Sequence, residues 1–155
     1  MKRLFTFFAI LAILSSCKSG GRVYSKNQDL SPQAEWLKKD TREFSVPVKE
    51  INILYNLKLS LRYVDGYQYQ FVKVKVTETS PGGKKSVKEY DLKVRENNGD
   101  YIGEAALDIW DSDHLVEANK KFTETGTYTY LIEQNMPVDP LTSVMEIGLI
   151  LEKVK

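Results

Sequence analysis

The sequence predicts an all-β protein, an antiparallel β-sandwich of Greek-key or jelly-roll-like type with one short N-terminal helix. From residue 43 onward, apolar and polar residues alternate with a period of two in several short segments. Turns rich in glycine, asparagine and proline separate these segments. Half-buried strands of this kind bury their apolar faces by packing two sheets together. The single cysteine and the single histidine are the other features that bear on function.

The chain begins with the three zones of a secretory signal peptide. Lys2 and Arg3 are basic, Leu4–Leu14 is apolar apart from Thr6, and small residues follow. As a helix the apolar segment would be about 17 Å long, whereas the hydrocarbon core of a bilayer is about 30 Å thick. The segment is too short to span a membrane, and residues 1–16 are therefore predicted to be a cleaved signal peptide.

Cys17 ends the tetrapeptide Leu-Ser-Ser-Cys, which resembles the bacterial lipobox. The resemblance implies a diacylglyceryl group on the thiol, cleavage just before Cys17, and an acyl chain such as palmitate on the new amine. An ordinary signal peptide with an incidental cysteine is the alternative. Several acyl chains anchor a protein far better than one. Lipidation would also consume the only thiol and leave none for a disulfide, a metal or a nucleophile.

The predicted organisation is therefore a signal peptide (1–16), a lipidated cysteine with a tether (17–22) and a β-sandwich domain (23–155). Removal of the signal peptide takes away two basic residues and no acid, which leaves 20 basic and 21 acidic residues. This balance lacks the basic footprint of a nucleic-acid-binding protein. The remaining length fits one domain.

The helix is predicted within residues 29–40, "DLSPQAEWLKKD". Ser31 can cap it, Pro32 suits its first position, and Trp36 and Leu37 can face the core. It has room for one or two turns.

Strands are expected over most of the remaining chain. Pro47 indicates that Glu43–Val48 is an edge strand. Residues 51–63 place apolar side chains on one face and mostly polar ones on the other. Further strands are expected at 70–79, 89–94, 102–110, 126–134 and 146–153, whereas 114–122 is ambiguous. Turns are expected at Asp65-Gly66, 80–85 and 96–101.

Gly126 stands two residues before Tyr128, at the start of a predicted strand. This arrangement resembles the tyrosine corner of Greek-key sandwiches, in which the phenol bonds to nearby backbone. It supports the predicted fold.

No catalytic constellation stands out, and we predict neither a cofactor, a metal site nor an enzymatic activity. His114 lies near Asp111, Asp113 and Glu117, which leaves a metal-assisted hydrolase as one hypothesis. A solvated loop is the simpler interpretation, because one histidine beside turn-favouring aspartates is weak evidence for a metal.

Two segments are candidates for partner docking. Tyr67 and Tyr69, with Tyr63 and Phe71, surround the Asp65-Gly66 turn and could stack on sugars or on a protein, although cross-strand packing is the simpler interpretation. Met136, Pro137 and Pro140 lie in an apolar loop that could dock with a partner, although methionine also fills gaps in cores.

The ordered set of segments resembles the GldH-type gliding-motility lipoprotein family of the Bacteroidota. The likeness covers most of the mature chain. The residues that carry it include the lipobox and the segments "EWLKKD", "YNLKLSLRYVDGYQYQ", "NNGDYIGEAALDI", "GTYTYLIEQNM" and "EIGLILEK".

The resemblance implies a non-enzymatic lipoprotein of the cell envelope that works with the gliding machinery and the associated type IX secretion system. The expected partners are the membrane, through the N-terminal lipid, and envelope proteins of that machinery. The residues after Cys17 lack the acidic run that often marks export to the outer leaflet, so we expect the domain to face the periplasm from the outer membrane. The alternative function is an envelope carbohydrate-binding lipoprotein that uses the tyrosines around residue 67.

Overall fold

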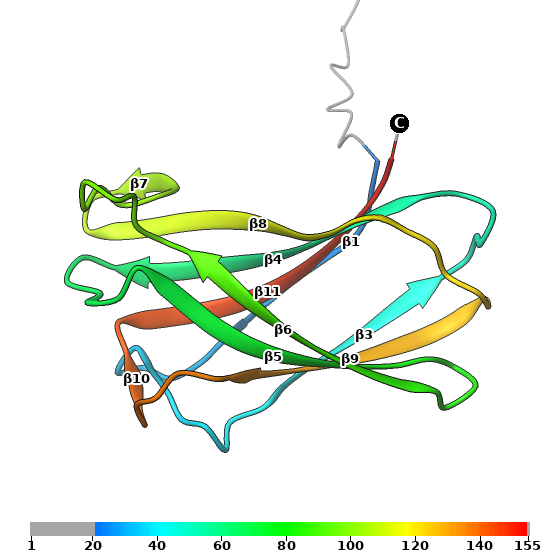
Figure 1. Cartoon of the computed structure of the whole chain (residues 1–155), viewed down its shortest axis with the longest axis horizontal. Coiled ribbons are helices and arrows are strands. Elements are labelled where there is room, and N and C mark those ends of the chain that lie inside the picture. The colour runs from blue at the N-terminus through cyan, green and yellow to red at the C-terminus, as the bar shows by residue number, and fades with distance from the viewer. Residues whose placement is uncertain (1–20, 155) are drawn as a thin grey trace, which may run out of the picture.

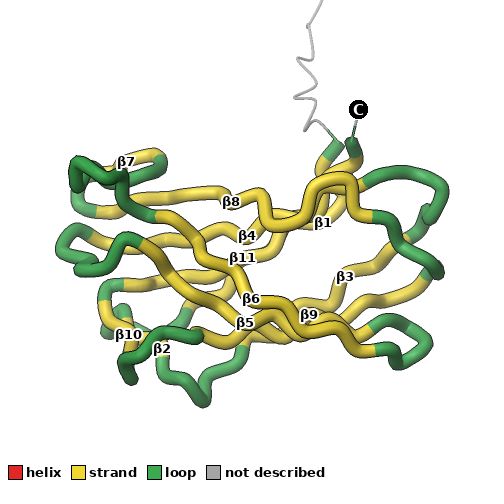
Figure 2. Tube along the Cα trace, viewed as in Figure 1, coloured by secondary structure: helices red, strands yellow, loops and turns green. Residues whose placement is uncertain are grey.

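The computed structural model describes residues 21–154. The predicted signal peptide, Cys17 and most of the predicted tether lie outside the described residues. Eleven strands make up the described part of the chain, and no helix occurs in it (Figures 1 and 2). All pairings are antiparallel, so the predicted all-β antiparallel class is confirmed. Residues 21–154 thus contain no helix that could cross a membrane.

Two larger sheets face one another and a two-stranded ribbon closes one end (Figure 1). The five-stranded sheet has the order β1 (Arg22–Asp29), β11 (Val144–Lys153), β4 (Tyr55–Val64), β8 (Ile109–Lys120) and β7 (Glu104–Ala106). The four-stranded sheet has the order β3 (Arg42–Val48), β9 (Gly126–Gln134), β5 (Phe71–Thr79) and β6 (Lys85–Lys93). The ribbon pairs β10 (Leu141–Thr142) with β2 (Glu35–Trp36).

The inner faces of the two sheets form one hydrophobic core. In β4 the alternation predicted from the sequence holds, and Tyr55, Leu57, Leu59, Leu61 and Tyr63 are all buried. The three valines of β5 and alternate residues of β9 and β11 complete the core. Because side chains of a strand point alternately to its two faces, the polar residues between them lie on the outer faces.

The predicted edge strand is confirmed at β3, which lies at the border of the four-stranded sheet with Pro47 opposite Thr127. Strands β5, β9 and β11 also lie where the alternation predicts strands, and the predicted strand at 89–94 covers the second half of β6 (Lys85–Lys93). β1 was not predicted. Six of its eight residues are polar, and Val23 is exposed. The strand forms by pairing with β11, which lies near the C-terminus of the sequence.

The predicted N-terminal helix is wrong. Ser31 begins only a single turn, in which the Ala34 amide donates to the Ser31 carbonyl and the Glu35 amide to the Ser31 hydroxyl, at 3.1 and 3.0 Å. The left-handed backbone of Ala34 (φ 53°) ends the turn. Trp36 then pairs with Leu141 and is fully buried, so a contact distant in sequence outweighs the local helix signals.

Two further predictions need correction. The Asp65-Gly66 turn exists, but β4 and β5 belong to different sheets, so the turn begins a crossover between sheets and not a hairpin. The segment 102–110 is not one strand, because β7 ends at Ala106 and a turn at Leu107 leads into β8. The ambiguous segment 114–122 belongs mostly to β8, whose alternation is broken by a register shift opposite Leu57.

The resemblance to a tyrosine corner holds in its geometry. The Tyr128 hydroxyl donates to the Glu124 carbonyl at 3.2 Å, and Gly126 has φ 133°. A side chain at Gly126 would meet the Pro81 ring at 2.8 Å. The Tyr128 ring packs on Phe122 with 4.6 Å between centroids, and Phe122 packs in turn on Tyr55 of the other sheet. This contact joins the two sheets at one end of the domain.

We expect Tyr128→Phe to lower the free energy of unfolding by about 1 kcal/mol, because it removes one buried hydrogen bond and keeps the ring. Urea unfolding followed by circular dichroism measures the change. Tyr130→Phe is the matched control. Within residues 21–154 the buried Tyr130 hydroxyl has no hydrogen-bond partner, so its removal should cost nothing. An equal decrease in the free energy of unfolding in the two variants would contradict a stabilising role for the tyrosine corner.

Candidate functional site

The two ends of the domain differ in what they expose. At one end, which we call the terminal end, Gly21 lies beside the end of β11, where the Lys153 amide donates to the Gly21 carbonyl at 2.8 Å. Residues 49–54 and 121–125 lie at the same end (Figure 1). At the opposite end, which we call the far end, the turn after β4 meets the β7–β8 turn, and the loop between β9 and β10 lies at the same end, on the side of the four-stranded sheet (Figure 1).

The far end contains a cluster of aromatic side chains. The Tyr63 hydroxyl lies 3.0 Å from the Val94 carbonyl and 2.5 Å from the Ile102 carbonyl, and burial raises the pKa of Tyr63 to about 12. Tyr67 packs edge-on against Tyr63 and donates its hydroxyl proton to the Phe71 carbonyl at 2.9 Å. Both rings are essentially unexposed. The prediction that Tyr67 forms part of an exposed docking edge is therefore wrong.

Two aromatic residues that the sequence did not single out lie nearer the surface of this cluster. Trp110 and Tyr101 are half-buried and stack with 5.2 Å between centroids. The Trp110 indole donates to the Asp65 carboxylate at 2.7 Å, and the Gly66 amide donates to the Tyr101 hydroxyl at 2.6 Å. The Arg95 guanidinium lies over the Tyr101 ring at 4.2 Å. These contacts fix the start of the crossover between β4 and β5. Trp110 and Arg95 both pack against the Tyr101 ring.

The loop after β9 is held in place by Gln134. Its buried side chain accepts from the Met136 amide at 2.8 Å and donates to the Val138 carbonyl at 3.0 Å. Met136 is 4% exposed, and its sulfur accepts from the Lys73 amide. Met136 therefore fills the core and is not available for docking, which corrects that prediction. Pro137 is exposed and Pro140 is half-buried, as is Tyr69, so docking through these three residues stays a prediction.

The most exposed large apolar side chain of the described chain is Leu107, which is 99% exposed. It occupies the β7–β8 turn at the far end, with φ 61°. Glycine, asparagine and aspartate are favoured at such turn positions. A leucine there buries no surface within the domain, so the domain's own packing does not explain it. No local sequence signal distinguishes Leu107 from a buried strand residue.

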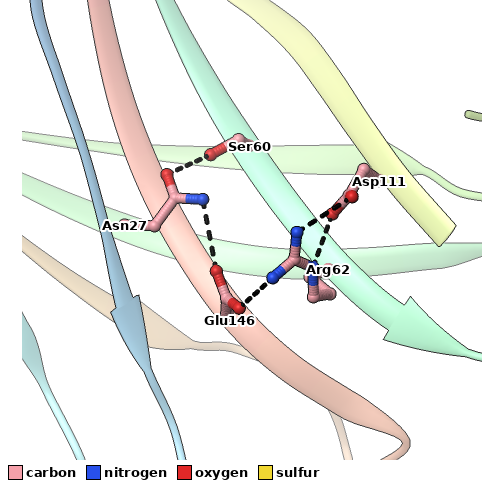
Figure 3. A network of polar contacts seen from close by, with 5 residues as sticks. All are labelled: Asn27, Ser60, Arg62, Asp111 and Glu146. Atoms are coloured by element: carbon pink, nitrogen blue, oxygen red, sulfur yellow. Dashed lines mark hydrogen bonds and ion pairs between the residues drawn. The ribbon is translucent and has the colours of Figure 1, made fainter. Parts of the chain in front are cut away.

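A polar network covers the outer face of the five-stranded sheet (Figure 3). Arg62 forms two hydrogen bonds with Asp111, at 2.8 and 3.0 Å, and one with Glu146 at 2.5 Å. These contacts, the Asp111 hydrogen bond first, raise the pKa of Arg62 against the effect of burial. The Asn27 amide nitrogen donates to Glu146 and its oxygen accepts from Ser60. The network ties four adjacent strands together across the sheet.

A second polar cluster lies between the sheets, on the side where β6 faces β8. Glu117 accepts from Lys88 at 2.9 Å, from Lys120 at 3.2 Å and from the Tyr90 hydroxyl at 3.0 Å. Lys120 also pairs with Glu78 at 2.7 Å. Burial by itself would raise the pKa of Glu117, but the two lysines outweigh it and the pKa is lowered. The cluster joins the open flanks of the two sheets.

His114 and the acids near it in the sequence do not form a metal site. His114 lies half-buried in strand β8 and not in a solvated loop, and its Nε2 is 2.9 Å from the Ser112 hydroxyl. Burial lowers the pKa of His114. Asp111 is bound to Arg62 and Glu117 to the two lysines. Within residues 21–154 no group of three or more histidine, cysteine, aspartate or glutamate side chains could hold a metal ion.

These features define a small all-β domain with two antiparallel sheets around one core, polar networks that brace its faces, and exposed apolar residues at its ends. Residues 22–151 match the family model described as GldH lipoprotein, and the chain belongs to that family. A membrane-anchored location in the cell envelope follows from membership of this lipoprotein family.

One curated relative and one solved structure illustrate the likeness. A protein of Christiangramia forsetii described as a gliding motility lipoprotein GldH homolog is 26% identical over 159 residues, which span 97% of this chain and 94% of that protein. A family GH115 4-O-methyl-α-glucuronidase with specificity for decorated arabinogalactans superposes with a TM-score of 0.45 at 13% identity. That match covers 86% of this chain but only 18% of the glucuronidase chain.

We expect Glu117→Gln to lower the free energy of unfolding at pH 7 by about 1–2 kcal/mol, since it weakens three hydrogen bonds. The folded-state pKa of Glu117 lies below its ordinary 4.5. The charged carboxylate therefore contributes stability above that value, and this contribution is lost as the pH falls through the folded-state pKa. As the pH falls into the acidic range, the free energy of unfolding measured with urea should therefore decrease less in Glu117→Gln than in the wild type.

Glu89→Gln is the control for this prediction, because Glu89 is exposed on β6 and lies outside the cluster. It should leave the free energy of unfolding at pH 7 unchanged. Parallel pH curves for wild type and Glu117→Gln would contradict the role assigned to the cluster.

Proposed function

We propose that the protein is a lipid-anchored, non-enzymatic component of the gliding-motility apparatus, associated with type IX secretion. In this proposal Cys17 carries the acyl chains, and the domain faces the periplasm from the outer membrane. One observation carries the proposal beyond family membership. The chain enters the domain at the terminal end, so an anchored domain presents its far end to other envelope proteins.

Chain geometry gives this arrangement a scale. Cys17 precedes Gly21 by four residues, so their Cα atoms are at most about 14 Å apart. Strand β4 has ten residues and runs from the terminal end to the far end over about 30 Å. A lipid on Cys17 would thus hold the terminal end close to the bilayer and keep the far end well away from it.

The side chains at the far end support an interaction role. Leu107 is the most exposed large apolar residue of the described chain, and Pro137 is exposed on the loop that Gln134 holds in place. A rigid surface with apolar residues at its tips suits docking to a protein, because little conformational freedom is lost on binding. The network around Arg62 and the cluster around Glu117 engage their charged groups in ion pairs, which favours a bracing role for these groups over a catalytic one.

The glycan-binding alternative is less well supported. It depends on exposed tyrosine rings, but Tyr63 and Tyr67 are buried and Arg95 and Trp110 flank Tyr101. It is kept as the hypothesis to test if no protein partner is found.

We expect Cys17→Ala to move the protein from the membrane fraction to the soluble fraction and to abolish its contribution to gliding. The physical reason is that each buried methylene of an acyl chain contributes about 0.8 kcal/mol to membrane binding. Fractionation and a surface-gliding assay of the complemented deletion strain measure the two effects. Full function from a released Cys17→Ala protein would contradict the anchor.

We expect affinity purification of the tagged, lipidated protein from native membranes to recover gliding or type IX secretion components. Leu107→Ser should reduce that recovery about tenfold, as loss of a central apolar contact does in many interfaces. Val87→Ser is the matched control, because Val87 is 59% exposed on β6, away from the β7–β8 turn. Recovery of the tagged protein alone would contradict the interaction role and make a sugar-binding panel the next experiment.

A further inference from the structure

The terminal end exposes a compact group of apolar side chains. Ile51 is 36% exposed and Val23 is 41% exposed, and these are two of the five large apolar residues that the described chain exposes. Ile53 and Leu54 are half-buried in the same loop, residues 49–54. Together with Lys121, the apolar residues of the loop line a shallow hollow. The strand pattern of the sequence placed Ile51 and Ile53 on the core face of β4, but β4 begins only at Tyr55.

This loop is fixed beside the point where the chain enters the domain. The Val154 amide donates to the Leu54 carbonyl at 2.9 Å, one residue after the Lys153 amide bonds to Gly21. The Tyr55 hydroxyl donates to the Glu50 carbonyl at 2.8 Å and so holds the start of the loop against β4. The exposed isoleucine is thus presented by a braced loop next to Gly21.

The charges around the loop favour a phospholipid surface. Lys49 and Lys121 are exposed and form no ion pair within residues 21–154. Glu50, the acid nearest in the loop, is paired with Lys153 at 2.6 Å. Apolar side chains flanked by lysines bind at the boundary between lipid headgroups and acyl chains, where the lysines meet phosphate.

We propose that residues 49–54, with Lys121, form a second membrane contact, in which Ile51 enters the headgroup region of the bilayer that holds the lipid anchor. The inference rests on the proposed function, because the anchor on Cys17 brings the loop to the membrane. The tether is at most about 14 Å long, so the loop is held within reach of the same leaflet. The acyl chains supply the affinity and the loop fixes the orientation, which directs the far end away from the lipid.

The test uses the full lipidated chain with a single added cysteine, Ile51→Cys, labelled with an environment-sensitive fluorophore. Lipidation of Cys17 leaves the added thiol as the only reactive one. The protein is reconstituted in vesicles of phosphatidylethanolamine and phosphatidylglycerol, with or without nitroxide-labelled phosphatidylcholine. Leu107→Cys is the matched control, since Leu107 is an exposed apolar residue at the far end. We expect nitroxide quenching at position 51 to exceed that at position 107 by about twofold or more.

Co-flotation with the vesicles is measured on the same samples and separates the two proposals. Flotation with equal quenching at both positions would overturn the membrane contact and leave the anchor standing. A label at position 51 that is protected from solvent but not quenched would also overturn it, because a protein and not lipid would then cover the loop. If the protein does not float with the vesicles, the proposed lipid anchor is wrong, and the proposed membrane contact of the loop is wrong with it.

Discussion

The period-two alternation of β4 is the constraint on which the rest of the structure depends. Tyr55, Leu57, Leu59, Leu61 and Tyr63 all point into the core between the sheets. A slip of one residue against β11 or β8 would turn this whole row outward, so burial fixes the register of three strands at once. The same register sets Ser60 and Arg62 on the outer face, where the network with Asp111 and Glu146 forms. It also places Tyr63 at the far end, where its hydroxyl lies within hydrogen-bond distance of the Val94 and Ile102 carbonyls.

Gly148 shows how closely the outer network depends on that register. It lies in β11 between Asn27 on one side and Ser60 on the other. A Cβ atom at this position would stand 2.1 Å from the Asn27 oxygen and 2.2 Å from the Ser60 hydroxyl. The absence of a side chain therefore lets the two polar groups meet above the strand. The core and the outer face are specified by one set of pairings.

Local periodicity was sufficient to predict β3, β5, β9 and most of β4 and β11, because each of these strands buries one face and leaves the other wet. In β6 only Leu92 is buried, and the alternation predicted only its second half. Local periodicity failed where pairing distant in sequence decides the structure. β1 has little alternation and exists because β11 lies beside it, and Trp36 pairs with Leu141 in place of the helix that Ser31 and Pro32 indicated. The register shift in β8 broke the alternation that would have identified it as one strand.

The candidate site was harder to predict, because exposure depends on the whole fold. Tyr67 and Met136 have the residue types of docking surfaces, yet they are buried by Tyr63 and by the Gln134-braced loop. Leu107 and Ile51 look like strand residues in the sequence, and only the turns around them leave them exposed. Lipidation of Cys17 stays a prediction, and it can be made from the sequence because a processing signal is a short linear peptide.

The pairing of β1 with β11 also bears on how the protein is made. The first strand of the domain lies against the last one, while β11 itself lies between β1 and β4. A chain that crosses a membrane from its N-terminus cannot complete the five-stranded sheet until its final strand has emerged. Until then β1 and the unpaired border of β4 remain open to other strands, the state in which aggregation competes with folding. For a chain exported as the predicted signal peptide implies, the pairing of β1 with β11 would therefore delay closure of the five-stranded sheet until the last strand has crossed the membrane.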